Sequence, residues 1–273
     1  MSVINTNVKS LVAQNALTVN SRALSKTMEQ LSTGKRINSA ADDAAGLGIS
    51  NKMTAQIRGL NQAVRNANDG ISMLQTAEGA TNEITNMLQR MRELAVQAAN
   101  DTYSADDRTA LGKEVSQLEA EITRIATNTK WNGMSVLNSA QDKTLQVGIA
   151  NSTDSDVTIS LQDMTSSGLD VAGLDLSSHA SAQGALDKLD AAIGKVDSFR
   201  ADLGAKVNRL NYAADNLNNV SMNTSASRSR IQDTDYAQAT TELARTQIIQ
   251  QAATAVLAQA NTDQQSVLKL LQG

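Results

Sequence analysis

A long alternation of apolar residues at steps of four and three is the feature that most limits what this chain can fold into. The alternation starts at Met53 and reaches Leu74, takes one additional three-residue step to Ala77, and resumes as far as Ala98. Such steps place apolar side chains along one side of a helix that packs against other helices. The two runs and their phase shift predict one helix of roughly 80 Å, at about 1.5 Å per residue, with a local change of supercoil.

The N-terminal residues 8–33 form a second expected helix, which ends where its apolar pattern stops at Thr33 and Gly34. Glycine readily takes the left-handed conformation that ends helices. A short linker follows, and then Ser39 and Asp42 have the spacing of a capping box for the start of the long helix.

After residue 98 a short polar segment separates the long helix from another seam, which runs from Leu111 to Ile125. We expect this segment to return antiparallel to the long helix after a tight turn. Ser104 and Asp107 provide the spacing of a second capping box, so we interpret the acidic residues there as caps and not as catalytic carboxylates.

The middle of the chain predicts a small β element. Asn132 and Gly133 form a turn dipeptide, and apolar and polar residues alternate in 145–149 and in 157–161, which predicts one or two small hairpins. The stretch 163–182 is rich in Ser, Gly and Asp, and we expect it to be a loop.

Helical periodicity returns in the C-terminal part of the chain, first between Leu186 and Leu217 and then from Asp235 to the end. Between Thr246 and Gly273 only Asp263 and Lys269 carry charge. A helix so poor in charge needs partners on several sides, so the C-terminal segment predicts assembly.

Composition excludes several kinds of site. The 273 residues include no Pro and no Cys, one His and 2% aromatic residues, with 24 basic against 28 acidic side chains. Without Cys there are no disulfides or thiolate metal sites, and without a basic block or stacking platform we expect no nucleic-acid partner. We expect no cofactor and no metal, and we interpret His179 as inert. No apolar run is long enough to span a membrane, and the N-terminus lacks the pattern of a cleaved signal peptide.

Four segments carry a resemblance to a known family. Residues 31–46 read LSTGKRINSAADDAAG, residues 65–72 read RNANDGIS, residues 89–97 read QRMRELAVQ, and residues 256–261 read VLAQAN. In this order they resemble the conserved blocks of bacterial flagellins. The resemblance covers the chain except for roughly residues 138–180, and it identifies a short form that lacks the large outer domains.

The resemblance and the periodicity together predict a mainly α fold, a long antiparallel helical coiled-coil or bundle hairpin with a small β-hairpin element in its middle. An inner filament-core domain would comprise residues 1–42 and 235–273. An outer domain would comprise residues 43–137 and 183–234, and residues 138–182 would be a short variable region.

The resemblance implies a non-enzymatic subunit that polymerises into the extracellular flagellar filament after export in an unfolded state. The implied partners are other copies of the chain, an export chaperone on the C-terminal helix, and the hook-associated junction and cap proteins. The residues expected to build the filament core are Leu17, Leu24, Met28, Leu31, Ile248, Ile249, Val256, Leu257, Val267, Leu268, Leu270 and Leu271.

A second expected contact surface lies on the long helix. Leu94 lies beside the predicted seam, on a flank that the seam does not require, so we expect it to contact a neighbouring subunit; a tolerated surface Leu is the alternative. The resemblance adds recognition of the monomer by the animal Toll-like receptor 5, through positions that match Arg90, Leu94 and Glu114. The expected receptor and subunit-contact set as a whole comprises Gln89, Arg90, Leu94, Gln97 and Glu114.

Three alternatives stay open from the sequence. A hook–filament junction protein of the flagellin-like family typically has Pro after the Asp-Asp pair, whereas Ala44 stands here. A secreted coiled-coil effector or adhesin would not need apolar helices at both ends of the chain. An enzyme is disfavoured because the sequence offers no nucleophile with its base and no cluster of metal ligands.

Overall fold

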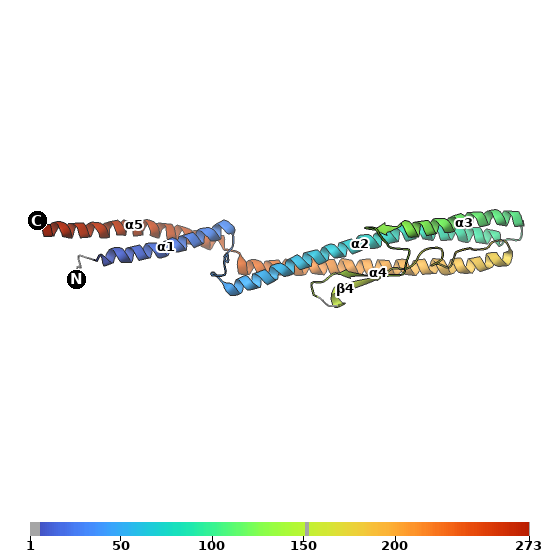
Figure 1. Ribbon diagram of the computed structural model, residues 1–273, viewed down its shortest axis with the longest axis horizontal. Helices are drawn as coiled ribbons and strands as arrows, with labels where there is room; N and C mark the ends of the chain where they lie inside the picture. The colour runs from blue at the N-terminus through green and yellow to red at the C-terminus, as the bar shows by residue number, and fades with distance from the viewer. Residues whose placement is uncertain (1–5, 151–152, 273) are drawn as a thin grey trace. The chain divides into compact units, whose positions relative to one another are not determined.

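The computed structural model describes the backbone of residues 6–150 and 153–272, and the side chains of residues 6–150 and 154–262 (Figure 1). Helices dominate these residues, as predicted for a mainly α chain, and the strands form two short antiparallel pairs. The elements are α1 (Val8–Thr33), α2 (Ala44–Ala98), α3 (Ala105–Asn128), β1 (Lys130–Trp131), β2 (Met134–Ser135), β3 (Asp142–Gln146), the 3-10 helix η1 (Thr153–Ser155), β4 (Asp156–Ser160), α4 (His179–Gln232) and α5 (Tyr236–Gln272).

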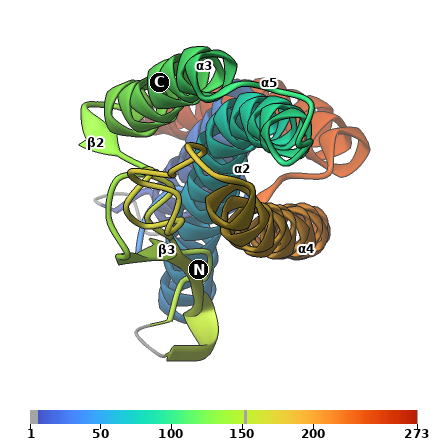
Figure 2. The same ribbon diagram turned by 90° about the vertical axis from the view of Figure 1, so that its right-hand side faces the viewer.

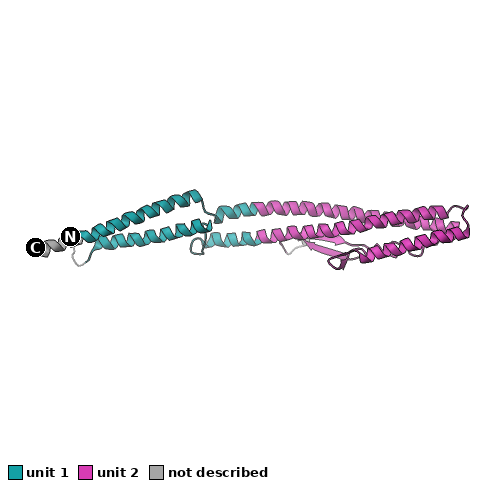
Figure 3. Cartoon of the chain, turned by 90° about the horizontal axis from the view of Figure 1, so that it is seen from above, with its two compact units in different colours: residues 1–55, 223–273 teal, residues 56–222 magenta. Residues whose placement is uncertain are grey.

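The chain forms two compact units. Unit 1 combines residues 1–55 with residues 223–273, and unit 2 comprises residues 56–222 (Figure 3). Helices α2 and α4 contribute residues to both units. The expected filament-domain boundaries at residues 42 and 235 stay a prediction, because the units reflect packing within one chain and not the layers of a filament.

Unit 2 contains a closed hydrophobic core. In Figures 1 and 2, α2 lies between α3 and α4. The heptad seam predicted on α2 is confirmed, since Leu74, Ile84, Leu88 and Met91 are fully buried. Phe199 of α4, the only Phe in the sequence, is among the largest fully buried side chains of the described residues. The long three-residue and four-residue alternation therefore serves a helical bundle.

The two strand pairs have different causes. The β1–β2 pair closes through Asn132 and Gly133, whose φ angles are 47° and 79°. Two successive positive φ values define the type I′ turn that Asn-Gly favours, so this prediction is confirmed. Strands β3 and β4 pair antiparallel from Asp142 opposite Ser160 to Gln146 opposite Asp156, although β3 begins three residues earlier than the predicted 145–149. Leu145 packs against Gly70 of α2, where a Cβ would collide with it.

The segment between β4 and α4 lacks regular structure up to residue 178, so the predicted loop ends four residues early. It is not a solvated loop, because Met164, Leu169, Val171 and Leu176 are buried in the unit 2 core. The Glu119 carboxylate of α3 also accepts hydrogen bonds from the main-chain nitrogens of Gly173 and Leu174, both at 3.0 Å. The segment therefore covers one side of the bundle and contributes to its core.

In unit 1, α1 and α5 lie side by side and antiparallel (Figure 1). Helix α1 has the predicted ends, and Gly34 follows it with φ 68°. The expected capping box of Ser39 and Asp42 is wrong in detail. Helix α2 begins at Ala44, and its cap is the Asp43 carboxylate, which accepts from the nitrogen of Gly46 at 2.8 Å.

Candidate functional site

The seam between α1 and α5 consists of small and polar residues at seven-residue intervals. Such residues let two helices approach closely, but they bury little apolar surface. On α1 and α5 the described residues of the seam that are buried or half-buried are Ala13, Asn20, Thr27, Ala239, Thr246, Ala253 and Ala260.

Two asparagine side chains donate hydrogen bonds across this seam. The Asn20 amide donates to the Thr246 carbonyl at 2.8 Å, and the Asn7 amide donates to the Ala260 carbonyl at 3.1 Å. In an antiparallel helix pair, the residue numbers of opposite positions have a constant sum. The sums are 266 for Asn20 with Thr246 and 267 for Asn7 with Ala260, so one register describes both contacts. The same register places Ala13 opposite Ala253. The buried Asn20 amide is satisfied, which a buried polar group requires.

Many of the large apolar side chains of this pair are exposed. Val12 is 64% exposed and Ile248 is 65% exposed. Burying such a side chain would contribute about 1.5–3 kcal/mol, so leaving several of them in water forgoes most of the hydrophobic stabilisation available to the pair. The exposed large apolar residues described on α1 and α5 are Val8, Leu11, Val12, Val19, Met28, Tyr236, Ile248, Ile249 and Val256.

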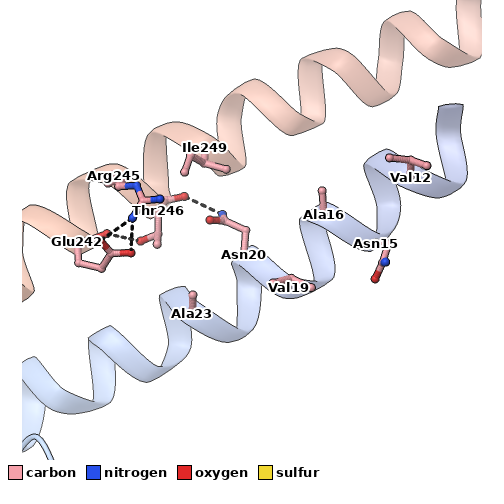
Figure 4. A pocket seen from close by; sticks show the side chains of 10 residues that line it. All are labelled: Val12, Asn15, Ala16, Val19, Asn20, Ala23, Glu242, Arg245, Thr246 and Ile249. Carbon is pink, nitrogen blue, oxygen red and sulfur yellow. Dashed lines mark hydrogen bonds and ion pairs between the residues drawn. The ribbon is translucent and has the colours of Figure 1, made fainter.

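An open groove of about 490 Å³ lies between the two helices (Figure 4). Val12, Ala16 and Val19 of α1 line it together with Ile249 of α5, and Asn20 lies at its floor beside Thr246. A second groove of about 430 Å³ shares Val12. The first groove is also lined by Asn15, Glu242 and Arg245, so it is partly polar. The pair therefore offers both apolar ridges and recesses, which is the combination that packed helices need from each other.

The structure divides the predicted filament-core residues into three groups. Leu17, Leu24, Leu31 and Leu257 are half-buried beside the seam. Met28, Ile248, Ile249 and Val256 are exposed. The side chains of Val267, Leu268, Leu270 and Leu271 lie outside the described residues.

Sequence reasoning missed the small-residue seam because it followed large apolar residues. The signal was available, since Ala13, Asn20 and Thr27 recur every seven residues on α1, as Ala239, Thr246, Ala253 and Ala260 do on α5.

The linkers that lead into α2 and out of α4 cross beside the terminal pair, and we call their contacts the clasp. Lys35 and Asp233 form an isolated β-bridge, and the nitrogen of Arg36 donates to the Gln232 carbonyl at 2.7 Å. The Arg36 guanidinium donates to the Ile231 carbonyl at 2.6 Å, which places a cation at the C-terminal end of α4. The Tyr236 hydroxyl donates to the Leu31 carbonyl at 2.9 Å.

Asp42 holds the linker between α1 and α2 in place. Its carboxylate contacts the Lys26 ammonium at 2.8 Å and accepts hydrogen bonds from the nitrogen and hydroxyl of Ser39. The hydrogen bond from Lys26 is the main cause that holds the pKa of Asp42 far below its ordinary value, and the Ser39 donors add to it. Lys26 thereby ties α1 to the turn before α2.

Four residues of the expected receptor and subunit-contact set lie on one exposed surface of α2 and α3. The Arg90 guanidinium donates to Glu114 of α3 and to Glu93, both at 3.0 Å, and these carboxylates raise its pKa. The Gln97 amide donates to the Tyr103 hydroxyl at 3.0 Å, and Gln89 is exposed.

Leu94 does not lie on this surface. Its side chain is 1% exposed and belongs to the unit 2 core, so the expectation that it occupies a free flank is wrong. Helix α2 packs against α3 on one side and α4 on another, so it buries a second stripe of residues beside the predicted seam.

His179 is the first residue of α4, and its Nδ1 donates to the Ala99 carbonyl near the end of α2, at 2.5 Å. Ser104 and Asp107 form the predicted capping box at α3, where hydrogen bonds from Ser104 lower the pKa of Asp107.

Among the described residues, no group of three or more acidic or His side chains could hold a metal ion. None of the helices searched over the same residues has the length and apolarity to cross a membrane.

Two family models match this chain. The model of the bacterial flagellin N-terminal helical region matches residues 4–142, and the model of the C-terminal helical region matches residues 186–271. Together they cover well over half of the sequence, including α1, α2 and α3 and most of α4 and α5.

Individual proteins are similar over nearly the full length. A flagellin from Halalkalibacterium halodurans is 45% identical over 270 residues, which cover 98% of this chain and 99% of that protein. The flagellar filament 30.7 kDa core protein of Treponema maltophilum is 41% identical at the same coverage. A solved Vibrio parahaemolyticus structure assigned as a flagellar hook-associated protein covers 70% of this chain at 13% identity and a TM-score of 0.59, which is a likeness of fold alone.

Proposed function

The chain belongs to the bacterial flagellin family and is a structural subunit of the flagellar filament, and we propose that its terminal helices gain their stability from like copies during assembly. One observation carries the proposal: among their described residues, α1 and α5 fully bury only Ala, Asn and Thr between them, and they expose their Val and Ile side chains. A helix pair with so thin an apolar seam is marginal alone, because nucleating isolated helices is unfavourable. Neighbouring subunits that cover the exposed side chains supply the missing burial.

The proposal extends to how the subunit reaches the filament. Terminal helices of low stability suit a chain that is exported unfolded and that folds at the growing end of an extracellular flagellum. Helix α5 would bind an export chaperone through the apolar residues that later face neighbouring subunits. Junction and cap proteins of the hook-associated class would contact the same terminal pair at the two ends of the filament. A catalytic activity has no place in this role.

We also propose that Toll-like receptor 5 recognises the monomer through the exposed surface of Gln89, Arg90, Gln97 and Glu114. The Arg90–Glu114 ion pair supports this, because it places polar side chains of α2 and α3 beside each other on the exposed surface. An Arg90→Ala, Glu114→Ala variant should lose receptor signalling while its helical content stays unchanged. An unchanged response would remove the assignment, and Lys113→Ala on the same helix is the control.

Seeded polymerisation followed by electron microscopy tests the assembly proposal. The full chain should extend filament seeds into long helical tubes, whereas chains lacking residues 1–33 or 236–273 should not. Tubes from either truncated chain would contradict the role of the terminal pair. Extension limited to a few layers would favour the junction-protein alternative, and the absence of any extension by the full chain would favour a secreted coiled-coil protein.

A further inference from the structure

The seam between α1 and α5 does not define its own register. Small residues recur every seven positions on both helices, so a shift of α5 by seven residues places Ala13 opposite Ala260 and keeps small residues in contact. A main-chain carbonyl for the Asn20 amide exists at each of these positions, because every helical residue carries one. The hydrogen bonds of the seam are therefore compatible with more than one alignment.

The larger residues beside the seam do not distinguish the two alignments. In the observed register Leu24 is opposite Leu243 and Leu31 is opposite Tyr236. A shift by seven residues would instead place Leu17 opposite Leu257 and Leu31 opposite Leu243. Each register leaves one leucine opposite Gln250, which is Leu17 in the observed register and Leu24 in the shifted one, so packing beside the seam does not explain the observed register.

The contacts that do distinguish the registers lie at the clasp. A shifted α5 would have to move Tyr236 away from the Leu31 carbonyl and draw its linker out of the bridge between Lys35 and Asp233. It would also strain the contact in which the Arg36 guanidinium donates to the Ile231 carbonyl. A hydrogen bond from a charged donor is among the stronger ones in a protein.

We propose that the clasp, through the side chains of Arg36 and Tyr236, sets the register of the terminal helix pair and so aligns the apolar side chains that neighbouring copies bind. This inference rests on the proposed assembly role of the pair. Arg36 and Tyr236 act as positioning residues, since their contacts are within the chain. A one-heptad error would move Ile248 and Val256 by two helical turns relative to Val12, and neighbouring copies would meet a different surface.

Cysteine cross-linking within filaments tests the proposal, because the chain has no Cys of its own. One chain carries Ala13→Cys with Ala253→Cys, which reports the observed register. A second chain carries Ala13→Cys with Ala260→Cys, which reports the shifted register. Each is copolymerised with an excess of unmodified chain, oxidised, and analysed on a denaturing gel for the cross-link within one chain. The observed-register pair should dominate.

In an Arg36→Ala, Tyr236→Phe background, the ratio of observed-register to shifted-register cross-links should fall roughly tenfold or more, as expected for the loss of a hydrogen bond to a charged group. Lys35→Ala is the matched control, since it removes a neighbouring cation whose bridge uses the main chain, and it should leave the ratio unchanged. If the double variant does not enter filaments, Tyr236→Phe alone is measured in the same way.

An unchanged cross-link ratio in the double variant would overturn the proposal. If the double variant does not enter filaments, an unchanged ratio in Tyr236→Phe would overturn it. Protection of the terminal helices in the free monomer would contradict the proposed coupling of folding to assembly but not the register assignment, because the cross-link ratio could then be measured in the monomer.

Discussion

The two units of this chain use the same helical repeat with opposite choices of residue. Unit 2 fills its seams with large side chains such as Leu88, Met91 and Phe199, all of which are buried. Among its described residues, the α1–α5 seam of unit 1 buries only Ala, Asn and Thr, and many large apolar side chains of these two helices are exposed. Periodicity therefore shows where a helix packs, whereas the size of the repeated residue shows whether that packing is enough for stability.

The strongest test of this comparison is a substitution that creates a cavity in the core of unit 2. Phe199→Ala should reduce the free energy of unfolding of the monomer by about 3–5 kcal/mol, because a large buried side chain leaves both lost burial and an unfilled space. Denaturant unfolding followed by circular dichroism measures it. Tyr212→Ala on the same helix is the control, since Tyr212 is 77% exposed. A cost below about 1 kcal/mol would mean that unit 2 does not depend on its core.

The matching change in unit 1 should affect only the filament. Ile248→Ala should leave monomer stability within about 0.5 kcal/mol, because the side chain is exposed in the single chain. In the filament the lost burial, up to about 1.5–3 kcal/mol, should raise the critical concentration roughly tenfold. Sedimentation of filaments at a series of protein concentrations measures this, with Gln247→Ala as the control. Equal critical concentrations for the two variants would show that Ile248 stays exposed after assembly.

A smaller effect is expected at the capping box of α3. Ser104→Ala should reduce the stability of unit 2 by about 1 kcal/mol, since the hydroxyl accepts from the nitrogen of Asp107. Thr102→Ala is a suitable control, because Thr102 donates to the Asn100 side chain through its main-chain nitrogen, which the substitution keeps. Thermal unfolding of the monomer distinguishes the two variants. Equal melting temperatures would show that the cap contributes nothing.

The smallest expected effect is the contribution of Asp42 in unit 1 to the acid sensitivity of the filament. The pKa of Asp42 is lowered in the folded chain, so its contribution is fully present above the ordinary Asp value of about 3.9 and is lost as the pH falls below that value. Filaments should therefore dissociate more readily in acid, and Asp42→Asn should make dissociation less dependent on pH. Light scattering during acid titration measures this. The same pH dependence in both proteins would exclude Asp42 as a contributor.

Sequence reasoning located most of the helices because large apolar residues at regular steps are visible in a single chain. It placed the end of α1 and the Asn132–Gly133 turn correctly, since both depend on local backbone preferences. The Asp43 cap was missed because the Ser39 pattern fits a turn equally well.

Two features that the sequence did not reveal depend on tertiary neighbours. Leu94 is buried because α2 has two helical partners, which one heptad pattern does not reveal. The segment before α4 is a loop up to residue 178, as predicted, but its burial was not foreseen, because Met164, Leu169 and Val171 are scattered among polar residues without a period. Register between distant segments, such as the clasp, has no signal in a single sequence.

Amide hydrogen exchange of the monomer and of the filament tests the central claim most directly. In the monomer, amides of α1 and α5 should exchange almost as fast as an unfolded chain, while amides around Leu88 and Phe199 should be strongly protected. In the filament both groups should be protected. Equal protection of the terminal helices and the unit 2 core in the free monomer would contradict the claim that assembly stabilises the ends of this chain.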